Sequence, residues 1–302
     1  MTSGGTTGIA TWRDPRWRTE ALEWAAGQLA RWGLEPAGEP EQPHVRTWST
    51  GFPLPLRGGG AAWLKSVGLG SAQEPVLARA LGGWAPGHVL VPLAVEPARR
   101  LLLLPDGGTT LRETGGDPAA WEDVLQAYAG LQLALVPHAD ALLALGVPDT
   151  RPERLPDLVD DLLADDGAQL IGRPRGLDPD VRRQLTARRD DVAKACRRRP
   201  GPFLSLLVAL RMAAGALGLR PGDPALGRLR DAYLEPWTAY GTPGQLRGQC
   251  DLALKVAPLE RALTWRRIPR GVHPDERGEW ADSVPGWTAE DFEPGPLAGV
   301  PA

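Results

Sequence analysis

One lysine and one glutamate stand out as residues that could do chemistry together. Lys65 ends the strand-like run AAWLK, and Glu74 lies at the start of the next helical segment. Lys65 is the first of three lysines in a chain that otherwise uses arginine. A strand lysine that is oriented by a helix glutamate can hold the phosphates of a nucleotide. From these two residues alone, the simpler interpretation is that Lys65 is a solvated strand residue and Glu74 caps a helix.

Five aspartates in one predicted helix and its end are the densest group of potential metal ligands. A solvated acidic face is the interpretation that we favour over a metal site. Neighbouring aspartates in a helix point to different sides and do not form a carboxylate pair. We therefore assign no metal ligand among Asp157, Asp160, Asp161, Asp165 and Asp166.

The arginine-rich segment 182–199 raises the question of nucleic-acid binding. Aspartates are interleaved with the arginines, and the segment has no aromatic residue that could stack on bases. The whole chain has a net charge of −3, which gives no general attraction to nucleic acid or acidic membranes. We expect a solvated helix end and no nucleic-acid partner.

The composition is that of a globular protein, with 302 residues, 42% hydrophobic and 24% charged. Scarcity of lysine and absence of asparagine indicate the coding bias of a GC-rich bacterium. Residues 1–11 have no basic region or apolar core, so we expect no signal peptide. The most apolar stretch, 203–219, contains Arg211 and is predicted to be a buried helix rather than a membrane span. These features favour a cytoplasmic protein.

The elements that must position Lys65 are a helix and several strands. Asp14-Pro15 is a typical helix start, and we expect the face with Trp17, Ala21, Ala25, Leu29 and Trp32 to be buried until Gly33 ends the helix. Strand-like runs follow at 45–50, 52–56 and 61–66, with Gly58-Gly59-Gly60 as a turn. Pro53 and Pro55 restrict the second run to a sheet edge. Ser71 and Glu74 have capping-box spacing for a helix over 71–81, and strands are predicted over 89–95 and 99–104.

Beyond a break near Asp106 the pattern is helical. One helix is expected over 121–136 with a continuation over 139–145, and residues 178–198 are predicted to form one long helix. Residues 269–302 are rich in Pro, Gly and acidic residues and are predicted to be a loose tail. The remaining helices are expected over 154–164, 203–217, 225–240 and 243–265.

The order of these features resembles the aminoglycoside phosphotransferase and choline-kinase-like superfamily. The resemblance is carried by VRTWST, WLK, EPVLARAL and LLLLPDGGTTLRE, and extends over about 15–265. The helices RDPRWRTEALEWAAGQL, PFLSLLVALRMAAG and LRDAYLEPWTAYG are also similar. It implies an α+β, bilobal protein-kinase-like fold. The N-lobe (1–105) would have an antiparallel sheet and a helix, and the mostly helical C-lobe (106–268) would precede the tail (269–302).

The resemblance also implies a cofactor and a site. ATP would bind between the lobes, with Lys65 and Glu74 as the phosphate-binding pair. The segment 102–106 would be the hinge that meets the adenine, so Leu102, Leu104 and Asp106 join the predicted cofactor site. The phosphate acceptor would be a small molecule that the sequence does not identify.

The sequence departs from this family in its catalytic loop. The family has His-x-Asp-x-x-x-x-Asn, in which Asp accepts the hydroxyl proton and Asn binds magnesium, followed by a second magnesium-binding Asp. This chain has no asparagine. By comparison with the family, we expect that a segment of a few tens of residues is missing at about 199–202. We therefore assign no catalytic residue, and magnesium binding is in doubt.

The triplet His138-Ala139-Asp140 matches His-x-Asp, but the position that requires Asn is Leu145. Its surroundings have helical apolar spacing, so we interpret it as part of a structural helix. The sequence thus leaves three hypotheses: an impaired ATP-dependent small-molecule phosphotransferase, a nucleotide-binding pseudokinase or interaction module, and a non-functional truncated gene product.

Overall fold

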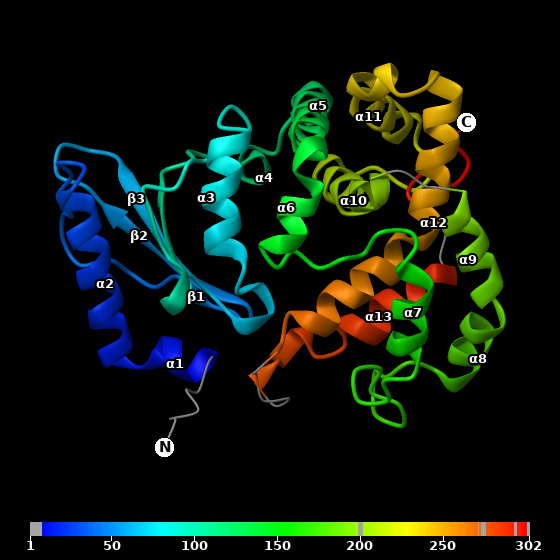
Figure 1. Cartoon of the computed structure of the whole chain (residues 1–302), viewed down its shortest axis with the longest axis horizontal. Coiled ribbons are helices and arrows are strands. Elements are labelled where there is room, and N and C mark those ends of the chain that lie inside the picture. The colour runs from blue at the N-terminus through cyan, green and yellow to red at the C-terminus, as the bar shows by residue number, and fades with distance from the viewer. Residues whose placement is uncertain (1–7, 199–201, 271, 273–275, 293–294, 301–302) are drawn as a thin grey trace. The chain divides into compact units, whose positions relative to one another are not determined.

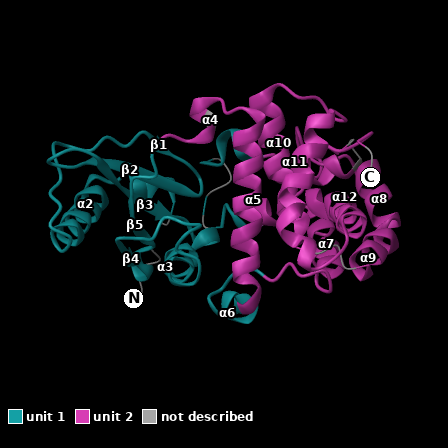
Figure 2. Ribbon diagram, turned by 90° about the horizontal axis from the view of Figure 1, so that it is seen from above, with its two compact units in different colours: residues 1–108, 138–148, 267–281 teal, residues 109–137, 149–266, 282–302 magenta. Residues whose placement is uncertain are grey.

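The computed structural model describes residues 8–198, 202–270, 272, 276–292 and 295–300 (Figure 1). The chain forms two compact units, each assembled from separate segments, as Figure 2 shows by colour. Unit 1 contains residues 1–108, 138–148 and 267–281, and unit 2 contains residues 109–137, 149–266 and 282–302. In the described part of the chain, no helix is both long and apolar enough to cross a membrane.

Unit 1 is built on a five-stranded antiparallel sheet with the strand order β1-β2-β3-β5-β4. Its helices lie before, between and after the strands along the chain. The strands are β1 (His44–Val45), β2 (Ser49–Pro55), β3 (Ala61–Val67), β4 (Ala94–Glu96) and β5 (Leu101–Pro105), and the helices are α1 (Ile9–Arg13), α2 (Pro15–Ala30), α3 (Glu74–Trp84) and α6 (Ala139–Ala144).

Helix α2 covers one face of this sheet, and its start at Asp14-Pro15 is the one that the sequence predicts. The Asp14 side chain accepts a hydrogen bond from the backbone N–H of Arg16, and Pro15 occupies the first helical position. Ala21, Ala25 and Leu29 are fully buried against apolar side chains of β2, β3 and β5.

The prediction that Trp32 lies on the buried face of this helix is wrong. Helix α2 ends at Ala30, so Trp32 lies beyond the helical periodicity that placed it on the buried face. The residue is 59% exposed, and its Nε1 donates a hydrogen bond to Leu93 O at 3.0 Å.

The proline-containing part of β2 pairs with β3 on one side only, as its prolines predict for an edge position. The pairing with β1 stops at Thr50 and Gly51, whereas the pairing with β3 continues to Pro55. The Pro55 carbonyl accepts from Ala37 N–H and so points away from β3. Pro53 lies two residues earlier, so its backbone groups point in the same direction. Both prolines therefore lack an N–H on the side away from β3, where pairing with β3 requires no donor.

The start of α3 also differs from its prediction. Ser71 belongs to a 3-10 turn over Leu69–Ser71, and Gln73 is the N-cap residue without a side-chain capping bond. The capping box is therefore absent, and the Glu74 carboxylate is available for another partner. The strand predicted over 89–95 is formed only at its end, by β4.

Unit 2 is helical. The segment 178–198 is interrupted at Arg188 and forms two helices rather than one. The helices are α4 (Leu111–Thr114), α5 (Pro118–Leu135), α7 (Leu155–Leu163), α8 (Pro179–Ala187), α9 (Arg189–Arg197), α10 (Leu206–Leu217), α11 (Pro224–Leu234), α12 (Pro243–Arg267) and α13 (Ser283–Ala289).

The predicted loose tail instead contains α13, which contributes to the core of unit 2. Val284 is 7% exposed and Thr288 is fully buried. Thr288 Oγ1 accepts from Gln169 Nε2 at 3.1 Å and donates to Val284 O at 2.9 Å. These buried contacts order a segment whose composition alone predicts disorder.

Helix α12 joins two apolar clusters of unit 2. Cys250 and Ala253 pack in a cluster with α5, α10 and α11, whereas Val256 and Leu259 pack with α7, α8 and α9. The second cluster also contains Cys196. Both cysteines are therefore core residues in a chain that forms no disulfide between them.

We expect the two thiols to react in a fixed order. Burial raises the pKa of Cys250 to about 12 and also raises that of Cys196. At pH 9 about one Cys250 thiol in a thousand is the reactive thiolate. Pulse labelling followed by mass spectrometry should modify Cys196 before Cys250, and Cys196→Ser should remove the early product. Earlier modification of Cys250 would contradict this packing.

Two glycines should respond to alanine with opposite signs. A Cβ on Gly70 would lie 2.6 Å from Ile268 O and still closer to Arg267 O, whereas nothing lies within 4 Å of a Cβ on Gly83 in α3. We expect Gly70→Ala to destabilise the protein by about 1–3 kcal/mol, since backbone must move. Gly83→Ala should stabilise it by about 0.5–1 kcal/mol, since alanine favours a helix. Thermal unfolding measures both, and equal shifts would refute the close approach at Gly70.

Candidate functional site

The site is set by the alternation of side chains along β3. Ala62 and Leu64 are fully buried on the sheet face that α2 covers. Trp63 and Lys65 must then lie on the opposite face, because successive residues in a strand point to opposite sides. The register pairs Lys65 with Leu102 and Trp63 with Leu104, so these four residues share one face of two neighbouring strands.

The Lys65 ammonium forms an ion pair with the Glu74 carboxylate. Glu74 is the first residue of α3, so the beginning of this helix brings its carboxylate to the sheet lysine. The side chains are 36% and 32% exposed, and solvent therefore reaches both. The structure thus replaces the predicted helix cap by a lysine–glutamate pair.

The predicted hinge residues differ in their surroundings. Leu102 is 1% exposed, whereas Leu104 is half-buried and Asp106 is exposed. Asp106 Oδ1 accepts from Trp63 Nε1 at 3.4 Å and from Gly108 N–H at 3.1 Å. Asp106 therefore holds the loop after β5 against β3, next to the sheet face that carries Lys65.

The glycine hairpin lies at the other end of β3 from Lys65. Gly58-Gly59-Gly60 precede Ala61 at the beginning of the strand, and all three have positive φ. The turn at the Lys65 end is Arg46-Thr47-Trp48, which joins β1 and β2.

Aromatic contacts at this end of the sheet were not predicted from the sequence. The Arg46 guanidinium lies 5.7 Å from the Trp48 ring centre, and Trp48 packs edge-on against Trp280 at 5.2 Å. The related signal in the sequence is its high tryptophan content, which does not predict which aromatic residues contact each other. These contacts bring residues near the C-terminal end of the chain to the β1–β2 turn.

The His138-Ala139-Asp140 triplet lies in helical structure, as expected. His138 ends a 3-10 turn and precedes α6, which contains Asp140. The imidazole stacks on Trp84 at the end of α3, with ring centres 4.3 Å apart and planes 4° apart. This stacking gives His138 a structural contact, and Asp140 is exposed.

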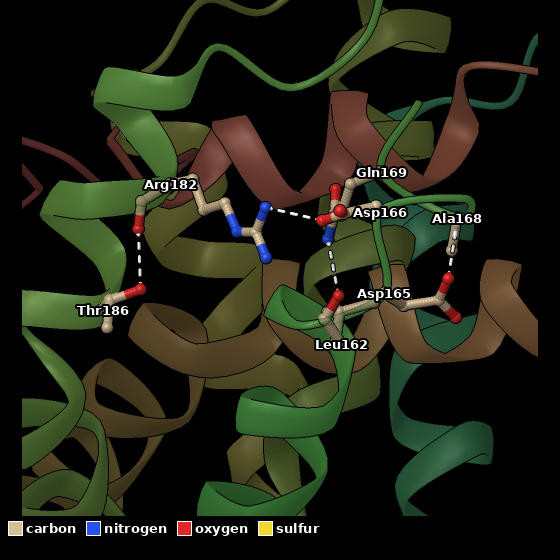
Figure 3. Close-up of polar contacts among 7 residues, drawn as sticks. All are labelled: Leu162, Asp165, Asp166, Ala168, Gln169, Arg182 and Thr186. Carbon is tan, nitrogen blue, oxygen red and sulfur yellow. Dashed lines mark hydrogen bonds and ion pairs between the residues drawn. The ribbon is translucent and has the colours of Figure 1, made fainter. Parts of the chain in front are cut away.

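The predicted acidic face is largely paired with arginines. Figure 3 shows Asp166 bound to Arg182, at 2.7 Å, and Asp165 accepting from the Ala168 N–H, at 2.9 Å. Asp165 also accepts from Arg266 Nε at 2.8 Å. Burial tends to raise the pKa of Asp165, but these hydrogen bonds outweigh it and the pKa lies below its usual value.

The same pattern continues along α7. Arg189 lies 2.6 Å from Asp160 and 3.8 Å from Asp157. Across the described residues, no three His, Cys, Asp or Glu side chains are grouped so that they could hold a metal ion. These aspartates therefore fasten α7 and the loop after it to α8, α9 and α12 through ion pairs.

The junction near 199–202, where the family resemblance predicts a missing catalytic loop, falls largely outside the described residues, because these stop at Arg198 and resume at Pro202. Just after it, Gln132 Nε2 donates to Pro202 O at 3.2 Å and to Ser205 Oγ at 3.3 Å. Helix α5 therefore fixes the chain where it enters α10.

Comparison with known proteins identifies the fold. No family model matches the sequence, and no curated protein matches it. A solved structure does match: the apoenzyme of macrolide 2'-phosphotransferase MphH from Brachybacterium faecium, with a TM-score of 0.50 and 17% sequence identity. The match covers 88% of this chain and 98% of that chain. At this identity the likeness establishes the fold alone, which is the α+β, kinase-like fold predicted from the sequence.

Proposed function

We propose that this protein binds ATP on the Lys65 face of its sheet and is a small-molecule phosphotransferase with impaired phosphate transfer. The observation that carries the proposal is the Lys65–Glu74 ion pair, formed between β3 and the first residue of α3. A carboxylate at this position orients the ammonium for nucleotide phosphates. The fold shared with a macrolide phosphotransferase supports the same assignment.

The residues around Lys65 fit a nucleotide. Gly51 is its register partner on β2 and has no side chain to cover the ammonium. Leu104 and Trp63 offer apolar surface to a base on the same face, and Asp106 follows at the end of β5. Leu102 is covered by protein atoms, so a bound nucleotide would contact Leu104 before Leu102.

Transfer is proposed to be impaired because the chain lacks side chains that the reaction uses. ATP brings magnesium to such a site, where the metal neutralises charge that develops on the phosphates. The family resemblance places the metal ligands and the proton acceptor in the segment that we propose is missing near 199–202. Lys65 can hold phosphates but can replace neither a carboxylate metal ligand nor a base.

A nucleotide-binding pseudokinase is the second candidate function. It uses the same Lys65–Glu74 pair, and it is favoured by the complete absence of asparagine from the chain. The two candidates share ATP binding and differ only in transfer, so separate measurements distinguish them.

Magnesium-ATP should raise the melting temperature of the native protein. A ligand at a hundred times its dissociation constant stabilises a protein by roughly 2.7 kcal/mol, which is several degrees for a chain of this size. The shift should disappear in Lys65→Ala. It should persist in Lys194→Ala, which removes an exposed lysine from α9. A cooperative melt that ignores nucleotide would refute ATP binding, and the absence of a cooperative melt would favour a non-functional gene product.

Transfer of labelled γ-phosphate to small hydroxylated acceptors should be undetectable or very slow. Any transfer that belongs to this site must be lost in Lys65→Ala. Transfer at ordinary kinase rates would contradict impairment, and its loss in Asp140→Asn would show that the His138 triplet is catalytic after all. ATP binding with no transfer would establish the pseudokinase.

A further inference from the structure

A cavity of about 430 Å³ lies within unit 2, lined by residues of α5, α10 and α12. Its volume is within the range of sites that bind small molecules. Leu207, Val208, Met212 and Ala257 supply apolar wall. The polar lining includes Ser205 and three side chains of α12: Glu260, Arg261 and Thr264.

Arg261 carries the positive charge among the described lining residues and is poorly compensated. Its side chain is half-buried, and its Nε is buried without a hydrogen-bond acceptor. Burial lowers the pKa of this guanidinium, with Glu260 acting in the opposite direction. No carboxylate of the described residues lies within ion-pair distance of Arg261. A half-buried charge in this condition is costly unless an anion is supplied.

Two indole rings partly stabilise this cation. The guanidinium carbon lies 5.6 Å from the centre of the Trp265 ring and 5.9 Å from that of Trp287. Contacts of this kind hold the guanidinium in place but satisfy none of its N–H groups. Arg261 is therefore fixed in position with hydrogen-bond donors to spare.

Ser205 provides a second donor at the cavity. Its Oγ accepts from the Tyr128 hydroxyl at 2.6 Å and from Gln132 Nε2 at 3.3 Å. Because both lone pairs are occupied, the hydroxyl hydrogen of Ser205 is left to donate. An oxyanion in the cavity can therefore accept from a cation and from a neutral hydroxyl.

Glu260 limits the charge of the anion. Its carboxylate accepts from Thr264 Oγ1 at 3.2 Å and lines the same cavity as Arg261. A doubly charged phosphate would be repelled more strongly than a singly charged carboxylate. The apolar wall in turn requires an apolar body on the ligand.

We propose that this cavity binds an amphipathic carboxylate, with its head on Arg261 and Ser205 and its alkyl or aryl body against Leu207, Val208 and Met212. The site lies wholly within unit 2 and does not depend on Lys65 or on ATP binding. A test of the ligand class proposed for this cavity is therefore independent of the proposed phosphotransferase function.

Calorimetric titration of the full chain with decanoate tests this site. We expect saturable binding to the native protein and weaker binding of decanol, decyltrimethylammonium and decyl phosphate. Arg261→Gln should weaken decanoate binding at least tenfold, since a charge-assisted hydrogen bond is lost. The matched control is Arg228→Gln. Arg228 is an exposed residue of α11 that lines a different groove, so this variant should bind decanoate as the native protein does.

A second variant covers the case in which Arg261→Gln fails to fold. Ala209→Leu places extra side-chain volume in the cavity and leaves every charge in place. It should also weaken decanoate binding while keeping a cooperative melt. The proposal is overturned if decanoate does not bind, if both cavity variants bind it like the native protein, or if Arg228→Gln is the variant that loses it.

Discussion

Burial of one face of the sheet against α2 is the constraint on which the candidate site depends. Ala62 and Leu64 are fully enclosed on that face, and the strand period then commits Lys65 to the other. A slip of β3 by one residue would exchange the two sets, placing the ammonium in the core and Leu64 in water. The apolar core of unit 1 therefore specifies the sheet face on which the Lys65–Glu74 pair lies, although neither residue of the pair belongs to that core.

The ion pair between Lys65 and Glu74 has a different role from the core. Both side chains are about one-third exposed, and pairs in such surroundings contribute only about 0–1 kcal/mol to folding. The main effect of the pair is to orient the Lys65 ammonium, because the lysine side chain would otherwise sample many rotamers. Glu74 can provide it because α3 begins without a capping box, and its first-turn carboxylate also suits the helix dipole.

The sequence predicts best what is decided locally. The Asp14 cap and the alternation of β3 depend on a few adjacent residues, and both are found in the structure. The start of α3 shows the limit, because a tertiary partner competes for the Glu74 side chain. The order of α13 was missed because Thr288 is held by Gln169, which is 119 residues away in the chain. Of the candidate site, the family resemblance implied the Lys65–Glu74 pair, whereas the Trp48–Trp280 contact depends on long-range packing.

The glycine turn between β2 and β3 has a practical consequence. Its three glycines are exposed, none has an atom within 4 Å of where a Cβ would be, and the turn is separated from Lys65 by most of β3. Lengthening such a loop costs little, since doubling it adds only about 0.6 kcal/mol of closure entropy. A peptide tag or fluorophore inserted at Gly59 would therefore report on unit 1 while leaving the register of β2 with β3 and the surroundings of Lys65 intact.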